Sequence, residues 1–181
     1  MDARAPLTRV PLVDEVLGPY RAHIGEDWAG YRNHVLRVLN FCRALSGEDA
    51  LPEALVIAAA FHDLGIWSDG TFDYIEPSAA HAASWLHSHD RPGEVDAVQS
   101  VIRMHHKLRP CDGVHAVQAE PFRRADLVDV SLGVVRFGLS RDYVAQVQRA
   151  LPDHGFHWRL VQLAGRQFLK TPLSPLPMLR W

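Results

Sequence analysis

The stretch Leu55-Val-Ile-Ala-Ala-Ala-Phe-His-Asp-Leu-Gly65 decides the fold. Its apolar part, residues 55–61, has almost no polar face and predicts a buried helix that begins near Pro52. Gly65 is a suitable residue to end that helix. His62 and Asp63 follow the apolar part directly, and burying a histidine beside a carboxylate costs free energy unless both have a partner. A metal ion is the partner that suits both side chains.

Other residues able to bind a metal lie on both sides of this stretch. Together with His62 and Asp63 they give the order H, HD, H, HH, D along the chain; they are His34, His81, His105, His106 and Asp126. Helical spacing puts groups of this kind on the apolar faces of several different predicted helices. Burying so many polar groups without a shared partner would cost several kcal/mol. The pattern therefore predicts a metal site.

Taken one at a time, two of these histidines have ordinary explanations. His34 shares an apolar stripe with Val38 and Cys42, where a lone histidine is more often a satisfied core residue. His81 lies one turn before Trp85 on a mixed helix, and alone it is as consistent with a surface role as with metal binding.

Two further positions leave a choice open. His105 continues an apolar stripe and faces the core, whereas His106 lies beside that stripe and either binds a metal itself or supports a ligand. Asp126 and Asp129 are one turn apart, and we expect one of them to face inward and the other to face solvent. We assign no chemistry to the remaining histidines, which lie in loops or near helix ends: His23, His87, His89, His115, His154 and His157.

Bulk properties narrow the class of protein. A chain of 181 residues fits one domain with a real core, and a formal net charge of −2 gives no field that would attract a nucleic acid polymer. Cys42 and Cys111 are the only cysteines, which favours a reducing, cytoplasmic location. The first residues do not read as a signal peptide, and no apolar stretch is long enough to predict a membrane span. The composition does not predict the oligomeric state, and a homodimer is one option.

Apolar spacing is helical nearly throughout and predicts an all-α fold, an irregular bundle of about seven or eight helices. The expected helices cover residues 11–17, 27–45, 52–63, 77–85, 92–105, 121–137, 140–151 and 154–169. We expect a single domain over 1–181, with the motifs in a core of about 28–135 and C-terminal helices of 140–170 packed on it. The proline-rich tail predicts no regular element, and Met178, Leu179 and Trp181 are expected to pack back onto the bundle.

The types of ligand restrict the metal. Imidazole nitrogens and carboxylate oxygens without thiolates favour one or two divalent ions among Mn, Fe, Co, Ni, Zn and Mg. A carboxylate can bridge two ions, so Asp63 is the natural bridge and the candidate catalytic residue. Two ions about 3.5–4 Å apart can activate a hydroxide and stabilise charge on a phosphoryl group.

This order of motifs resembles the HD-domain superfamily of metal-dependent phosphohydrolases, over about residues 28–135. The resemblance implies a helical HD-domain bundle in which one metal is bound by His34, His62, Asp63 and Asp126. In members with two metals, the second ion is bound by residues that match His81 and His105. The spacing Ile102-x-x-His105-His106 and the pair at 125–126 also match the family.

The chain departs from two branches of that family. Ile66 occupies a position where the cyclic-dinucleotide branch has lysine and where the known oxygenases tend to have lysine or histidine. The Gly-Tyr-Pro signature of the cyclic-dinucleotide branch is replaced after His106 by Lys107-Leu-Arg-Pro110. These departures argue against a cyclic dinucleotide as substrate and lower the case for an oxygenase.

The resemblance implies hydrolysis of a small phosphorylated metabolite, a nucleotide in the first place, by metal-activated hydroxide. Lys107 and Arg109 follow the histidine pair and are the expected phosphate-binding residues. Trp67, Phe72 and Tyr74 are expected either to wall an organic pocket or to anchor their loop. The alternatives are a di-iron oxygenase acting on an alcohol or phosphonate and a non-catalytic metal-binding sensor module.

Overall fold

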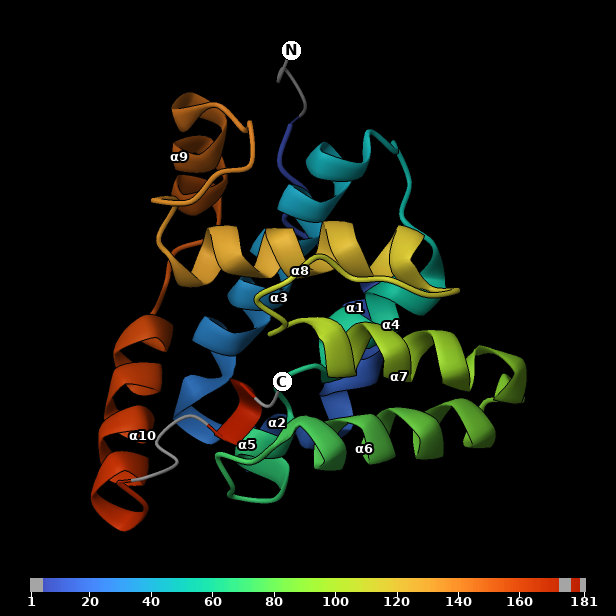
Figure 1. The fold of residues 1–181 in the computed structure, drawn as a ribbon, viewed down its shortest axis with the longest axis vertical. Coiled ribbons are helices and arrows are strands. Elements are labelled where there is room, and N and C mark those ends of the chain that lie inside the picture. The colour runs from blue at the N-terminus through green and yellow to red at the C-terminus, as the bar shows by residue number, and fades with distance from the viewer. Residues whose placement is uncertain (1–4, 173–176, 180–181) are drawn as a thin grey trace.

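The computed structural model describes residues 5–172 and 177–179. Within these residues the chain is all-helical and contains no strand, which confirms the predicted fold class (Figure 1). The α-helices are α1 (Pro11–Leu17), α2 (Arg21–Ile24), α3 (Trp28–Ser46), α4 (Glu53–Phe61), α5 (Gly65–Ser68), α6 (Ile75–Ser88), α7 (Val95–Met104), α8 (Ala116–Val130), α9 (Arg141–Ala150) and α10 (Phe156–Lys170). None of the described helices combines the length and the apolar character needed to cross a membrane.

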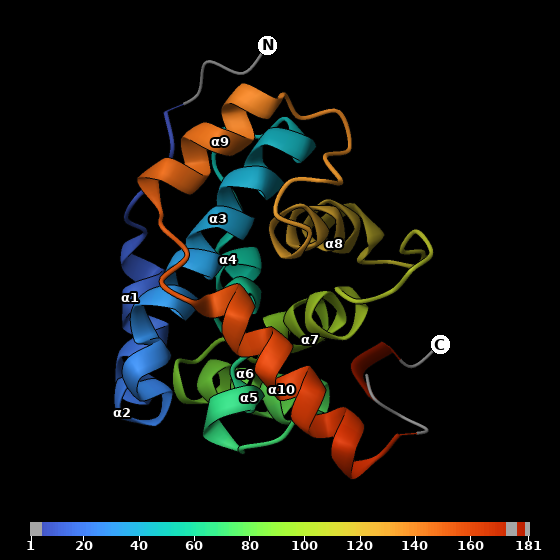
Figure 2. The same ribbon diagram turned by 90° about the vertical axis from the view of Figure 1, so that its left-hand side faces the viewer.

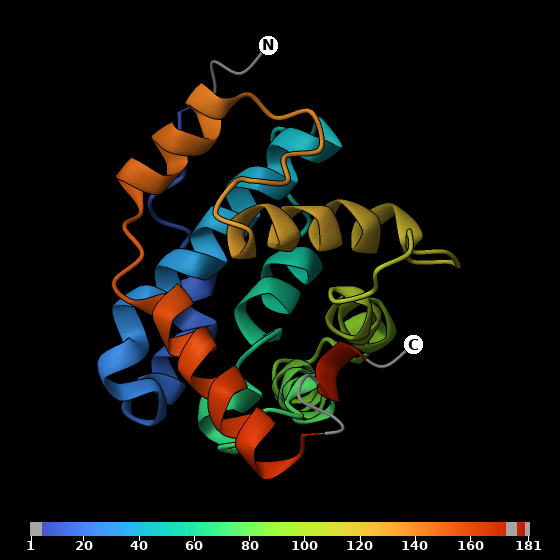
Figure 3. The same ribbon diagram turned by 60° about the vertical axis from the view of Figure 1, so that its left-hand side comes forward.

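Helices α3 and α4 form the centre of the bundle. Helix α8 packs on α3, and α4 packs against both α1 and α7. Helices α6 and α7 lie side by side, and α8 crosses above them (Figures 1 and 3). Helix α10 runs diagonally across one side of the bundle (Figure 2). Each residue from Leu55 to Phe61 is buried, so α4 packs against the core on all its faces.

The end of α4 differs from the sequence-based expectation at Gly65. Helix α4 ends at Phe61, and Gly65 is the first residue of α5 instead of the residue that ends α4. The backbone of Gly65 is not left-handed. A Cβ at this position would lie 2.7 Å from the carbonyl oxygen of Tyr74, so glycine is required by a close approach of two backbones. The amide of Gly65 also donates to the hydroxyl of Ser78 at 2.9 Å.

Helix α8 begins earlier and ends earlier than the predicted helix over 121–137. Pro121 lies inside the helix rather than in its first turn, and the carbonyl that would pair with its missing amide belongs to Val117, which is 85% exposed. The helix ends at Val130 because Leu132 and Gly133 adopt positive φ, and the Gly133 amide bonds back to the Val128 carbonyl at 2.8 Å.

The C-terminal helices follow the predicted order with small shifts. Ser140 caps α9 by accepting from the Tyr143 amide at 3.2 Å. Helix α10 starts at Phe156, because Gly155 and the residue before it have positive φ. Residues 177–179 form a short 3-10 turn in which Met178 is buried. The expectation for Trp181 falls outside the described residues.

Candidate metal centre

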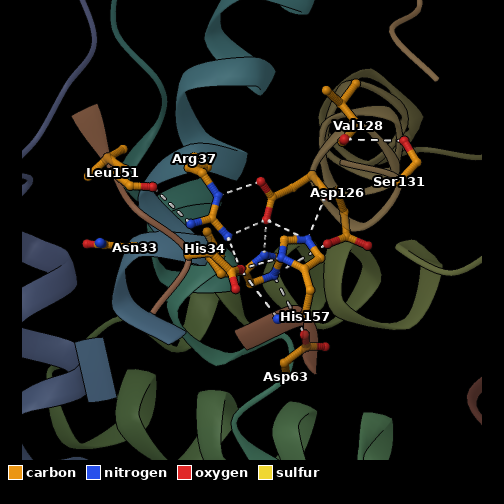
Figure 4. Close-up of polar contacts among 12 residues, drawn as sticks. Asn33, His34, Arg37, Asp63, Asp126, Val128, Ser131, Leu151 and His157 are labelled. Carbon is orange, nitrogen blue, oxygen red and sulfur yellow. Dashed lines mark hydrogen bonds and ion pairs between the residues drawn. The ribbon is translucent and has the colours of Figure 1, made fainter. Parts of the chain in front are cut away.

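Six polar side chains from four places in the fold meet in the interior; we call them the ligand cluster. They are His34 in α3, His62 and Asp63 at the end of α4, His105 and His106 directly after α7, and Asp126 in α8. Five of them are buried, and His106 is partly exposed. Figure 4 shows His34, Asp63 and Asp126 facing one another from three different helical segments.

The first group in the cluster contains His34, His62 and Asp63, whose candidate ligand atoms all lie within 4.8 Å of one another. The two Nε2 atoms of the histidines are 3.0 Å apart. The Asp63 Oδ2 atom lies 3.7 Å from the His34 Nε2 and 3.4 Å from the His62 Nε2. Asp126 Oδ1 approaches the same nitrogens at 3.5 and 3.7 Å.

These separations suit a shared metal ion. Ligand atoms about 2.0–2.2 Å from a tetrahedral ion lie roughly 3.3–3.6 Å from one another, and the separations here, from 3.0 to 3.7 Å, bracket that range.

The second group contains Asp63, His105 and His106, so Asp63 belongs to both groups. It presents its other oxygen here, since its Oδ1 lies 3.4 Å from the His105 Nε2. Asp126 also faces this side, with its Oδ2 4.0 Å from the His106 Nδ1. Asp63 thus presents one carboxylate oxygen to each group.

Hydrogen bonds fix the orientation of the buried rings. The Nδ1 atom of His62 lies 2.7 Å from the Ala59 carbonyl, and that of His105 lies 2.6 Å from the Ile102 carbonyl. A carbonyl only accepts, so Nδ1 carries the proton in each ring, and in the neutral ring the Nε2 lone pair faces the cluster. His106 is reversed: its Nε2 is 2.6 Å from the Tyr74 hydroxyl, and its Nδ1 faces inward.

Several buried polar atoms of the cluster lack a hydrogen-bond partner among the described residues. They are Asp63 Oδ1, His105 Nε2 and Asp126 Oδ1. Such atoms are costly to bury unless something absent from the protein chain pairs with them. The donor set of imidazoles and carboxylates therefore fits a divalent metal.

The electrostatics of the cluster favour a cation. Burial alone would lower the pKa of His62, but the carboxylates of Asp63 and Asp126 raise it to about 9. Burial would raise the pKa of Asp63, yet the neighbouring histidines, His62 foremost, hold it below its usual range. Burial and the neighbouring His105 lower the pKa of His106 to about 3, which keeps that ring neutral and able to bind a metal.

Asp129 corrects the expectation that only one of the two aspartates in α8 faces inward. It is fully buried, as Asp126 nearly is. Its carboxylate accepts from Arg37 at 2.6 and 2.8 Å and lies 2.7 Å from the His34 Nδ1, which aims the His34 Nε2 at the cluster. Burial raises the pKa of Asp129, but the bonds to His34 and Arg37 outweigh that effect and lower it.

Two contacts from the C-terminal half support this arrangement. Arg37 also donates to the Leu151 carbonyl at 3.1 Å (Figure 4). His157, to which the sequence assigned no chemistry, donates through Nε2 to the Asp129 carbonyl at 2.8 Å and bonds through Nδ1 to Asp153. Asp153 lies in the loop before α10 and also accepts from the His157 amide at 3.3 Å. An aspartate just before a predicted helix is the signal that could have identified this pair.

His81 is not brought to the ligand cluster. Its Nε2 lies 2.8 Å from the Asp69 Oδ2 near the surface, and its ring packs edge-on against Tyr20. The second group contains His106 where His81 was expected.

A cavity of about 360 Å³ opens onto the cluster. Asp63, His105, His106 and Asp126 line it together with Lys107, the first of the two expected phosphate-binding residues. Arg109, the second, lines a neighbouring cavity with Lys107 instead.

The three aromatic residues of the loop after Asp63 divide between the two roles expected of them. Phe72 and Tyr74 line the cavity. Trp67 anchors the loop, because its ring lies 4.5 Å from that of Tyr31 and its Nε1 donates to Asp27 at 2.9 Å.

Comparisons with models of protein families, with curated proteins and with solved structures found no match to this chain. The structure itself establishes an all-helical chain with a buried cluster of histidines and aspartates that could hold metal.

Proposed function

We propose that the protein is a metal-dependent phosphohydrolase that acts on a small phosphorylated metabolite. One observation carries the proposal: two groups of ligand residues share Asp63, and Asp63 lines a cavity together with the second group and Lys107. The resemblance of the motif order to the HD-domain superfamily supports the same reaction. A shared carboxylate between two sites is the arrangement expected for a pair of ions about 3.5–4 Å apart.

We infer that the ions are divalent, chosen from Mn, Fe, Co, Ni, Zn and Mg. His34, His62, Asp63 and Asp126 would hold one; Asp63, Asp126, His105 and His106 would hold the other. Bound ions of this kind lower the pKa of water and neutralise charge on phosphoryl oxygens.

The chain's own residues bind and orient the substrate in this proposal. Lys107 lines the cavity beside the cluster and neutralises a non-bridging phosphate oxygen. Tyr74 holds the His106 ring through the bond at 2.6 Å, which leaves the Nδ1 of that ring directed inward. In the overall reaction the oxygen of water bonds to phosphorus and the ester P–O bond breaks. The leaving oxygen takes a proton from water, so an alcohol and inorganic phosphate are released.

The test is release of phosphate from a panel of nucleotides, sugar phosphates and simple phosphate monoesters. Protein purified without chelators is supplied with Mn²⁺, Co²⁺ or Ni²⁺ and assayed with and without dioxygen. We expect turnover that needs metal and does not need oxygen. Oxygen consumption without phosphate release would favour the di-iron oxygenase, and metal binding without any turnover would favour the sensor module.

A further inference from the structure

Most of the described cavity lining outside the ligand cluster is apolar. Its residues come from the loop after α5, from α8 and α10, and from the turn at 177–179; they include Phe72, Leu127, Leu160, Val161 and Met178. Binding is favoured when an apolar ligand surface is buried against apolar walls, and a charged or strongly hydrated ligand surface gives no such gain.

The cavity contains little positive charge to match a chain of phosphates. Arg123 lines it, but its guanidinium is engaged by both oxygens of Glu120 at 2.8 Å and by the Lys107 carbonyl at 3.1 Å. Lys107 is therefore the one cation of the described lining residues that takes part in no ion pair with a carboxylate of the described chain. One lysine beside a metal centre suits a single phosphate group.

The described residues of the cavity also offer few groups that would recognise a base or a sugar. Outside the ligand cluster, the described lining side chains that can form hydrogen bonds are Tyr74, Lys107 and Arg123. Tyr74 is already bonded to His106, and Arg123 to Glu120. Selective binding of a nucleobase requires polar partners for its edge, because an unpaired polar group loses its hydration on burial.

We propose that this cavity binds a phosphate monoester with an apolar alkyl or aryl body, not a nucleotide. The phosphate lies at the ligand cluster and Lys107, and the body lies between α8, α10 and the turn at 177–179. The inference rests on the proposed function for its reaction, in which water replaces the apolar alcohol on phosphorus. It concerns the body of the ligand, so binding tests it separately from turnover.

The experiment measures the affinity of methyl-, butyl- and hexylphosphonate by calorimetry on the full chain loaded with Mn²⁺. Alkylphosphonates carry the head group and resist hydrolysis. We expect the affinity to rise by roughly fourfold for each methylene that fits, the equivalent of about 0.8 kcal/mol. AMP is expected to bind no more tightly than methylphosphonate. The heat capacity change should become more negative with chain length.

Two variants in α10 provide a matched pair. Val161 lines the cavity and is 58% exposed, whereas Leu169 is 81% exposed and does not line it. Val161→Asn should flatten the dependence on chain length, and Leu169→Asn should preserve it. Equal affinities for the three phosphonates, or tighter binding of AMP than of hexylphosphonate, would overturn the inference.

The matching phosphate esters separate the two proposals. Hydrolysis of hexyl phosphate in preference to AMP supports both. Hydrolysis of AMP in preference to hexyl phosphate retains the hydrolase and rejects the apolar body. Binding that rises with chain length, with no hydrolysis of any ester, rejects the hydrolase and retains the apolar cavity.

Discussion

Asp63 is the residue that both ligand groups share, so its carboxylate should control the metal content of the whole site. We expect Asp63→Asn to lose both ions, because the amide removes the negative charge and one of the two ligand oxygens. The helical fold should persist, since the apolar residues of α4 are untouched. Elemental analysis and circular dichroism measure the two effects. Asp69→Asn, at an exposed carboxylate, is the control, and full metal content in Asp63→Asn would contradict the bridging role.

The histidine of the second group can be tested by comparing two positions. His106→Ala should lower the occupancy of the second ion while leaving the first, because His106 lies in one group only. His81→Ala should keep both ions, since the His81 ring bonds to Asp69. Metal titrations of the two variants measure the difference. Loss of an ion from His81→Ala with none from His106→Ala would reverse this assignment.

The buried ion pair of Arg37 and Asp129 orients the His34 ring through its Nδ1 atom, on the side of the ring away from the ligand cluster. Asp129→Asn removes the nearer of the two carboxylates that face the buried Arg37, because the Asp153 carboxylate lies 3.8 Å away. Removing one partner of a buried ion pair costs about 3–5 kcal/mol. The same change weakens the hold on the His34 ring and should reduce metal affinity by roughly 10–100-fold. Urea unfolding and metal titration give the two values. Glu76→Gln, which breaks an exposed pair with Arg103, should change stability by less than about 1 kcal/mol.

At the residue scale, helical periodicity predicted the buried ligands in regular helices and left the role of His106, beyond the end of a helix, undecided. His34 and Asp126 lie within α3 and α8, where spacing along the chain predicts the face of each side chain. His105, which the apolar stripe places in the core, and His106, for which the spacing leaves two roles open, follow the last residue of α7, and both rings reach the cluster. Asp129 was misjudged because the sequence does not reveal that Arg37, remote along the chain, is buried beside it.

The junction of α5 and α6 should be sensitive to a single methyl group. Gly65→Ala would put a Cβ 2.7 Å from the Tyr74 carbonyl, and overpacking of this kind costs about 1–3 kcal/mol. Because Tyr74 holds the His106 ring, a shift of Tyr74 should also lower the affinity for the second ion. Gly93→Ala is the matched control, since its Cβ would meet nothing within 4 Å. Thermal unfolding and metal titration compare the two, and equal behaviour would refute the close-approach argument.

At the element scale, the long amphipathic and apolar helices were predictable, and their ends were not. Patterns of apolar residues gave α3 and α4 nearly to the residue, because apolar residues recur with helical spacing in α3 and α4 is apolar on all sides. Helix α8 was misplaced because a proline usually starts a helix, whereas Pro121 is tolerated inside this one. Its end depends on the positive φ of Leu132, a residue type that rarely signals a left-handed backbone.

For the molecule as a whole, removal of metal should lower stability without abolishing the fold. An ion that binds only the folded state stabilises it by about 2.7 kcal/mol at a concentration one hundred times its Kd. In a chain of 181 residues this corresponds to a rise in Tm of roughly 5–10 °C. Differential scanning fluorimetry with and without a chelator measures it. The Tm of Asp63→Asn should not depend on metal. An unchanged wild-type Tm at saturating Mn²⁺, Co²⁺, Ni²⁺ and Zn²⁺ would argue against a bound metal.

The scatter of the ligand cluster along the chain has a consequence for protein synthesis. Its side chains extend from His34 in α3 to Asp126 in α8, and the group that orients His34 comes later still. A nascent chain emerges from the ribosome with its N-terminus first. The cluster can therefore not be completed until α8 has left the exit tunnel and docked on α3. A metal would then be acquired after translation of most of the chain, and ribosome-bound chains that end before α8 should not retain it.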